Sequence, residues 1–199
     1  MGLFDSTPAA QANPNKERFI ALLLATGRPG ISDLLQWLED SDFYDAPASA
    51  NHHGAKEGGL LEHSLAVEEK ITPICECFGM DIPMESQRLV ALLHDLCKVG
   101  VYKIDYRNKK NEETGKWEKV PYYAIEDQFP MQHGPKSVYL AGKFIRLMDE
   151  EAMAITFHMG AWHAVEYGEK QSLGRAMGMY PLILALQTAD LAATYYDGK

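Results

Sequence analysis

Apolar residues recur every three or four positions along most of the chain, which is the period of an amphipathic α-helix. Proline, serine or aspartate stands at the start of most of these stretches, where helices commonly begin. The pattern predicts seven helices, which begin near Pro14, Ser32, Gly59, Pro83, Pro135, Asp149 and Pro181. We expect the first to end near Gly27, the third near Phe78 and the fourth near Lys98. The expected fold class is therefore all-α, a bundle of about seven helices.

One stretch, near residues 101–126, lacks the helical period. Aromatic and β-branched residues that favour strands flank a polar turn ending in Thr-Gly, and they include Tyr102, Tyr106, Trp117 and Tyr122. We expect a β-hairpin here, inserted between the helix that carries His94 and Asp95 and the helix that follows His133.

Several histidines and aspartates stand where the helical period places core residues. His63 shares a stripe with Leu60 and Val67. Asp190 lies in a stripe that includes Leu186. An ionisable group in the interior is costly unless it has a partner. One shared cation would serve all of these groups, which predicts a metal site built from His63, His94, Asp95, His133, His158 and Asp190.

Neutral imidazole and ionised carboxylate are good ligands for divalent cations of intermediate softness. We expect one or two ions of Mn, Fe, Co, Ni, Mg or Zn. The first would be held by His63, His94, Asp95 and Asp190. His133 and His158 would complete a second site, with one carboxylate bridging the ions, or would bind phosphate directly. Such ions lower the pKa of bound water from about 15.7 to roughly 7, which provides a nucleophile at neutral pH.

Composition narrows the function classes. The chain has 199 residues and a formal net charge of −9 at pH 7, whereas a dedicated nucleic-acid binder usually has a basic surface. We expect one domain over residues 13–199 after a flexible segment 1–12. The three cysteines are too few for a disulfide framework, and no apolar run is long enough to cross a membrane. A cytoplasmic setting is expected, and the sequence indicates no oligomeric state.

Two strings around the predicted ligands carry a family resemblance. GGLLEHSLAV contains the first histidine, and ALLHDLCKVG contains the His-Asp pair. Together with the last aspartate they resemble the motifs of the HD superfamily of metal-dependent phosphohydrolases. His133 and His158 resemble the additional ligands of its six-ligand, two-metal members, such as the HD-GYP phosphodiesterases. The string HHGAKEGGLLEHS is also similar to the HD portion of some bacterial 3′→5′ exoribonucleases.

The resemblance covers roughly residues 50–195 and implies hydrolysis of a phosphate monoester or diester by metal-activated water. A nucleotide or another small phosphorylated metabolite is the expected substrate. Because the chain has neither a Gly-Tyr-Pro string nor a nucleic-acid-binding barrel, cyclic dinucleotides and RNA are not supported, and a stand-alone bacterial or phage HD hydrolase is expected. Two alternatives stay open: an HD-type di-iron oxygenase with the same ligands, and a non-catalytic nucleotide-binding HD domain.

Residues near the predicted ligands are candidates for catalysis and substrate binding. Lys98 resembles the family's lysine after the His-Asp pair and would face the phosphate. The predicted catalytic residues are Asp95, Lys98 and His53. Besides Lys98, the predicted substrate-binding residues lie on the hairpin, where the cations would meet phosphate and the ring would stack on a base: Lys103, Arg107 and Tyr123. A solvated charged face is the alternative for these hairpin cations, and Cys97 is expected to be a packing residue.

Overall fold

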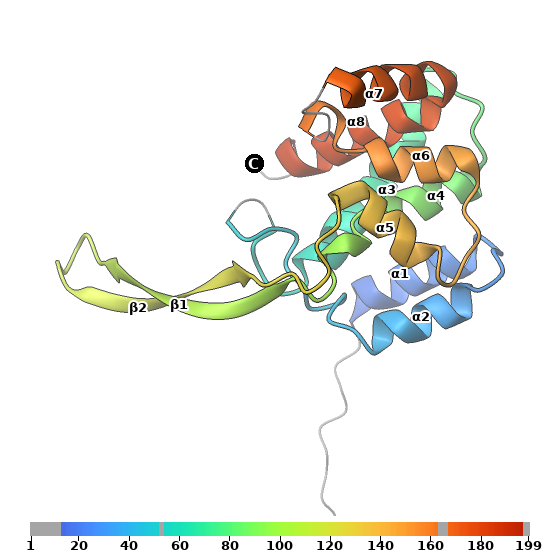
Figure 1. Ribbon diagram of the computed structural model, residues 1–199. Helices are drawn as coiled ribbons and strands as arrows, with labels where there is room; N and C mark the ends of the chain where they lie inside the picture. Colours follow the sequence, from blue (N-terminus) through green and yellow to red (C-terminus); the bar gives the residue numbers. More distant parts are fainter. Residues whose placement is uncertain (1–12, 52–53, 163–166, 197–199) are drawn as a thin grey trace, which may run out of the picture.

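The structure, a computed structural model, describes residues 13–51, 54–162 and 167–196. Within these ranges it contains eight α-helices and one pair of strands (Figure 1). The helices are α1 (Pro14–Leu24), α2 (Ile31–Glu39), α3 (Gly59–Cys77), α4 (Met84–Leu93), α5 (His133–Ala141), α6 (Asp149–Phe157), α7 (Tyr167–Met179) and α8 (Pro181–Tyr195). The strands are β1 (Tyr102–Lys110) and β2 (Trp117–Ile125), and two short 3-10 helices are η1 (Leu96–Lys98) and η2 (Gly160–Trp162). A mostly helical fold with one small sheet is thus confirmed.

The first and last helices begin where the sequence predicts. The side-chain oxygen of Asn13 accepts hydrogen bonds from the backbone N–H groups of Asn15 and Lys16, at 3.1 and 3.2 Å. These amides have no partner inside the helix, so the side chain stabilises its start. Pro14 and Pro181 occupy the first positions of α1 and α8, where the missing N–H of proline costs nothing.

Two clusters of buried apolar side chains hold the helices together. The first includes Phe19 of α1 and Leu61 of α3, and the second includes Val67 of α3 and Leu186 of α8. Helix α3 therefore joins the two clusters, and His63 lies on it between Leu61 and Val67. No helix in the described part of the chain is both long and apolar enough to span a bilayer.

Helix α4 is shorter than the sequence pattern predicted. We expected one helix through Lys98, but α4 ends at Leu93, and His94 and Asp95 form a turn before η1. The backbone of Asp95 has φ −105° and ψ 19°, outside the α-helical values. The chain therefore changes direction at His94 and Asp95. Because of this bend, the side chains of two consecutive residues can approach the same centre.

Two features of the C-terminal half also differ from expectation. The sequence pattern aligns Ile155, His158 and Trp162 on one predicted helix. Helix α6 instead ends at Phe157, so His158 follows the helix, and Trp162 is exposed in η2. Helix α7, which packs beside α8 (Figure 1), was not predicted. Its sequence carries Gly168, Gly174 and Gly178, and glycine disfavours helix by about 1 kcal/mol relative to alanine. Packing on a neighbouring helix overrides that local preference.

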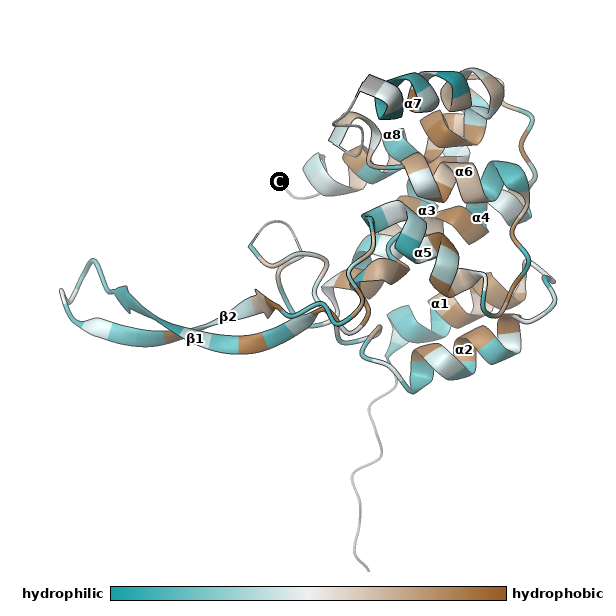
Figure 2. Cartoon of the chain, in the orientation of Figure 1, coloured by the Kyte–Doolittle hydropathy of each residue, from teal (hydrophilic) through white to brown (hydrophobic). Residues whose placement is uncertain are grey.

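The predicted β-hairpin is confirmed. Strands β1 and β2 pair antiparallel, with Tyr102 opposite Ile125 at the base and Lys110 opposite Trp117 at the far end. The hairpin projects away from the helices (Figure 1), and Figure 2 shows hydrophilic residues along it interrupted by a few hydrophobic ones. We call residues 102–125 the arm.

Candidate metal centre

The six predicted metal ligands come from five segments and meet in the helical body. His63 is on α3, His94 and Asp95 follow α4, His133 is the first residue of α5, His158 follows α6, and Asp190 is on α8. Their ligand atoms form three overlapping groups, each with all atoms within 4.8 Å of one another: His63, His94 and Asp95; His94, His158 and Asp190; and Asp95, His133 and His158. We call these six residues the His/Asp cluster.

The carboxylate of Asp95 lies at the middle of the cluster, and its two oxygens face different histidines. Oδ1 is 2.6 Å from Nε2 of His133 and 3.8 Å from Nε2 of His158. Oδ2 is 3.5 Å from Nε2 of His94 and 3.7 Å from Nε2 of His63. Asp95 thus connects two pairs of imidazoles.

Helix α8 closes the cluster through Asp190. Its Oδ1 is 3.1 Å from Nε2 of His63, which is in turn 3.2 Å from Nε2 of His94. The hydroxyl of Thr194, one turn further along α8, lies 3.5 Å from the same carboxylate oxygen. These contacts hold the side chain of Asp190 close to His63. The cluster thus contains two carboxylates, Asp95 after α4 and Asp190 on α8, four helices later in the sequence.

Backbone carbonyls fix the orientation of two of the histidines. Nδ1 of His94 is 2.8 Å from the carbonyl oxygen of Ala91, and Nδ1 of His158 is 2.7 Å from that of Ile155. A carbonyl oxygen can only accept, so each Nδ1 donates and each neutral ring keeps its lone pair on Nε2. Among the described residues, the buried Nε2 of His158 has no hydrogen-bond partner. A metal ion would satisfy this otherwise costly lone pair, so the residues fit such an ion.

The protonation states of these residues suit a cation. Burial lowers the pKa of His94, and burial together with the neighbouring His94 lowers the pKa of His158 to about 3. Both rings are therefore neutral at pH 7, the form that binds metals. Burial acts to raise the pKa of Asp190, but the hydrogen bond from His63 and nearby imidazoles lower it, so this carboxylate is ionised.

Asp95 is an ionised carboxylate between two cations. Burial acts to raise its pKa, but Lys98, His94 and His133 hold it well below the usual value. Nζ of Lys98 is 2.6 Å from Oδ2, and this contact raises the pKa of Lys98 against the effect of burial. Burial likewise acts to lower the pKa of His133, yet its hydrogen bonds to Asp95 and Cys97 raise it to about 10. His133 must therefore release a proton before its Nε2 can bind a metal.

A close approach of two helices brings His133 beside His158. A Cβ atom at Gly134 would collide with the backbone oxygens of Ile155 and Thr156 on α6. Only glycine allows α5 and α6 this separation. The ring centroids of His133 and His158 are consequently 5.2 Å apart.

Cys97 does more than pack. Its Sγ is 3.3 Å from Nδ1 of His133, and its backbone N–H donates to Oγ of Ser137 at 3.0 Å. Both contacts connect η1 to α5 and hold the ring of His133 from the side opposite Asp95. The sequence pattern did not reveal these partners, because Cys97 and Ser137 meet only through the packing of α5 on η1.

A cavity of about 260 Å³ reaches the cluster at His63. Gly59 and Ala66 of α3 and Ala193 of α8 line it, and Lys56 stands at its wall. Nζ of Lys56 is 2.7 Å from Glu62. Sequence reasoning missed Lys56; its position just before α3, in the loop leading to His63, was the available signal.

The predicted substrate residues on the hairpin lie outside the His/Asp cluster. Lys103 forms an ion pair with Glu126. The guanidinium of Arg107 lies 5.2 Å from the ring centroid of Tyr122. Arg107, Tyr122 and Tyr123 line a cavity of about 410 Å³ together with the loop residues Ala50, Asn51 and Ala55, whereas Lys103 does not line it. The third catalytic candidate, His53, lies outside the described residues.

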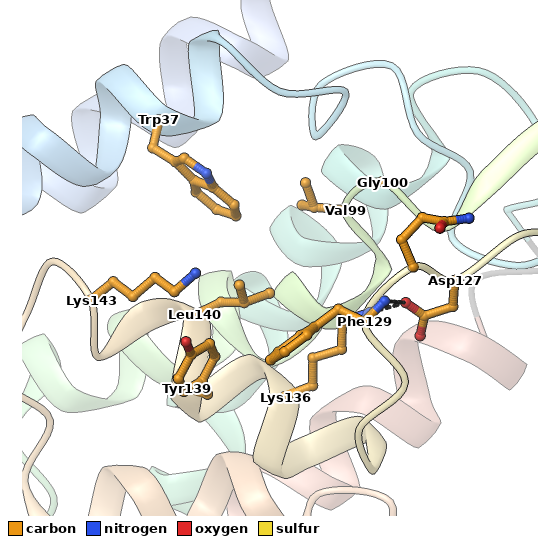
Figure 3. A pocket seen from close by; sticks show the side chains of 10 residues that line it. Trp37, Val99, Gly100, Asp127, Phe129, Lys136, Tyr139, Leu140 and Lys143 are labelled. Atoms are coloured by element: carbon orange, nitrogen blue, oxygen red, sulfur yellow. Dashed lines mark hydrogen bonds and ion pairs between the residues drawn. The ribbon is translucent and has the colours of Figure 1, made fainter.

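A further cavity, of about 210 Å³, lies between α2, α5 and the segment after the arm (Figure 3). Trp37, Phe129 and Tyr139 contribute aromatic walls. The buried Lys136 is already paired there, with its Nζ 2.7 Å from Oδ1 of Asp127. None of the six cluster residues lines this cavity, so it is separate from the candidate metal centre.

Comparison of the chain with protein-family models, with curated proteins and with solved structures gave no match. The chemistry of the site therefore follows from its own residues. A mostly helical protein brings buried histidines and aspartates together in an arrangement that can hold a metal ion.

Proposed function

We propose that this protein is an HD-type, metal-dependent hydrolase of phosphate esters that acts on a nucleotide or another small phosphorylated metabolite. The observation that carries the proposal is the convergence of six candidate ligand side chains in three overlapping groups, with the lone pair of His158 left without a hydrogen-bond partner among the described residues. Divalent cations held there would supply Lewis acidity, which makes a hydroxide nucleophile available near neutral pH.

The cluster offers ligands on both sides of Asp95. His63 and His94 face one carboxylate oxygen, and His133 and His158 face the other. This arrangement supports two ions with Asp95 between them, and Asp190 adds a second ionised carboxylate. Mn, Fe, Co, Ni, Mg and Zn all accept such nitrogen and oxygen ligands.

Positive charge near the cluster supports an anionic substrate. Lys98 reaches Asp95 directly, and Lys56, which pairs with Glu62, lines the cavity that opens at His63. Ammonium groups stabilise phosphate oxygens and the negative charge that develops during phosphoryl transfer. We assign Lys98 this role, and we assign Arg107 and Tyr123, in the cavity beside the arm, to the remainder of the substrate. Lys103, which pairs with Glu126, lies on the same strand as Arg107.

The test combines metal analysis with a substrate panel. Protein purified without chelator is analysed for bound metals and assayed with p-nitrophenyl phosphate, its bis ester and nucleotides, each with several added metals. We expect hydrolysis that Asp95→Ala abolishes together with metal binding, while Asp33→Ala, which removes an exposed carboxylate on α2, leaves both intact. An Asp95→Ala protein as active as wild type would remove the proposal.

Measurements of bound iron and of oxygen uptake distinguish the proposed hydrolase from a di-iron oxygenase. Two bound irons, oxygen uptake and no hydrolysis of any phosphate ester would replace the proposal with the oxygenase. Tight nucleotide binding without turnover under any metal would replace it with the binding domain.

A further inference from the structure

The two faces of the arm differ in chemistry. Successive side chains of a strand point to opposite sides, and residues directly opposite in an antiparallel pair share a side. The pairing of β1 with β2 therefore puts four aromatic and two aliphatic side chains on one face: Tyr102, Tyr106, Trp117, Tyr123, Ile104 and Ile125. We call this side the aromatic face.

Most of the aromatic face is open to solvent, although Tyr102 and Tyr123 near its base are half-buried. Ile104, Tyr106, Trp117 and Ile125 are each 58–70% exposed. Exposed apolar residues scattered singly need no explanation, but a contiguous row of them on one side of a sheet indicates a binding surface. The row runs the length of β1, which has nine residues and spans about 30 Å at 3.3 Å per residue.

The charge on this face has one sign. Its charged residues are Lys110 and Lys119, which share the face with Asn108. Both acidic residues of the two strands, Asp105 and Glu118, lie on the opposite face. The net charge of −9 for the whole chain therefore does not describe this surface, which is suited to an anionic partner.

The row begins close in sequence to the His/Asp cluster. Tyr102 is the first residue of β1, four positions after Lys98, whose Nζ lies 2.6 Å from Oδ2 of Asp95. An extended ligand on the aromatic face would therefore have one end near the segment that carries Lys98.

We propose that the aromatic face of the arm is a binding surface for single-stranded nucleic acid. Such a strand combines flat bases, which stack on tyrosine and tryptophan, with phosphates that pair with lysines, in a row along its length. The arm offers both kinds of group in a row of matching form. Tyr123 and Ile104 of this face also line the cavity assigned to the substrate. The surface is tested independently of the proposed hydrolysis through Tyr106, Trp117, Lys110 and Lys119, which lie outside that cavity and outside the His/Asp cluster.

Two other occupants fit the face less well. Packing the aromatic faces of two copies together would bury Lys110 and Lys119, and no carboxylate of the paired strands lies on this face to pair with them. A membrane would be entered by the tip of the hairpin, but the turn at residues 111–116 reads Asn-Glu-Glu-Thr-Gly-Lys and contains no apolar residue.

The test measures binding of a fluorescent oligothymidylate long enough to span the arm, by anisotropy in EDTA, so that no metal chemistry contributes. We expect measurable affinity that falls about tenfold for each ring removed, in Tyr106→Ala and Trp117→Ala. Lys119→Gln removes a cation from the aromatic face, and its matched control Lys109→Gln removes one from the opposite face. We expect the first to weaken binding and the second to leave it within about twofold. In Lys110→Gln/Lys119→Gln, the slope of log affinity against log salt should fall by about 1.4.

Each contrary result has a distinct meaning. No binding of the oligonucleotide at high protein concentration, or an equal loss of affinity in Lys119→Gln and Lys109→Gln, would contradict the proposed binding surface. A dimer in sedimentation that dissociates in Trp117→Ala would assign the face to a second copy, and binding to anionic lipid vesicles without binding to the oligonucleotide would assign it to a membrane. Circular dichroism of each variant confirms that the hairpin and helices are retained. Phosphatase activity measured separately distinguishes failure of the arm from failure of the proposed hydrolysis.

Discussion

The His/Asp cluster and the arm both gather polar and aromatic groups, but the fold treats them in opposite ways. In the cluster, five segments hold their side chains at fixed distances inside the helical body. In the arm, two strands carry their side chains into solvent, and no hydrophobic cluster includes them. An isolated two-stranded hairpin is marginally stable in water, so the arm gains little from its own packing.

This difference separates what the two regions can do. Burial costs the cluster residues free energy unless a partner compensates them, and the unpaired Nε2 of His158 indicates a partner of metal-ion type. The exposed side chains of the arm carry no cost of burial, so their presence alone does not indicate a ligand. They indicate a binding surface only because the rings lie on one face of the hairpin.

The largest effect on stability is expected at Glu151, a buried charge with its own protein partners. Arg28 lies 2.6 Å from one of its oxygens, Ser86 donates to that oxygen at 2.7 Å, and the Met148 N–H donates to the other at 2.8 Å. Removing one partner of a buried ion pair costs about 3–5 kcal/mol, so we expect Glu151→Ala to lower the free energy of unfolding by that amount in urea titrations. Val120→Ala on the arm should change it by less than about 1 kcal/mol. A large loss at Val120 would show that the arm contributes to the core.

His158 should behave differently from Glu151, because no described protein group forms a hydrogen bond with its Nε2. We expect His158→Leu to change the stability of the metal-free protein little, since the removal of the unpaired Nε2 offsets the loss of the hydrogen bond from Nδ1 to Ile155. The variant should lose the stabilisation that added metal gives wild type, about 2.7 kcal/mol at a hundredfold excess over Kd. Thermal unfolding with and without metal measures both. A variant that metal still stabilises would remove His158 from the ligands.

Two glycine substitutions compare a crowded helix contact with an open one. Gly134→Ala must push α5 away from α6 and so displace His133, which we expect to weaken metal binding about 10–100-fold. A Cβ at Gly174 on α7 meets nothing within 4 Å, so Gly174→Ala should leave metal affinity unchanged and add about 0.5–1 kcal/mol to stability. Calorimetric titration with Mn²⁺ or Zn²⁺ distinguishes the two. Equal affinities in both variants would contradict the role given to the α5–α6 contact.

The smallest effect is a pH dependence of stability. Burial acts to raise the pKa of Glu151, but Arg28 and the other donors lower it below its usual value. A carboxyl with a lowered folded-state pKa stabilises the protein above its unfolded-state pKa of about 4.3, and this stabilisation is lost as pH falls through the folded-state pKa. We therefore expect stability to fall below about pH 4, with a weaker fall in Glu151→Gln. Urea midpoints at several pH values measure this, and parallel curves for the two proteins would contradict it.

Much of the fold could be predicted because its signals are local. Apolar periodicity and the proline or aspartate at helix starts gave seven of the described helices, and aromatic residues at 102–125 gave the hairpin. The missed helix α7 has three glycines and depends on packing against α8. The early end of α4 was missed because residues through Lys98 keep a helical pattern, while the backbone turns at Asp95.

The residues that form the cluster could be predicted because ionisable residues in apolar stripes are conspicuous in any sequence; their role as metal ligands stays a prediction. Their mutual distances could not be predicted, and neither could the partners Cys97, Ser137 and Lys56, which depend on how α5 and the loop before α3 pack. The two faces of the arm likewise required the register, in which Tyr102 pairs with Ile125. A shift of one residue would have changed which lysines accompany the rings.

The candidate ligands His63 and Asp190 lie far apart in the chain, yet Nε2 of His63 and Oδ1 of Asp190 are 3.1 Å apart. An ion held by both residues would be a reversible cross-link between them, and the chain between the two residues contains most of the helices and the whole arm. Closing so long a loop is entropically demanding in the unfolded chain, so affinity for the ion would report on assembly of the entire body. Occupancy of the metal would then rise and fall with folding itself, and loss of α8 alone would release it.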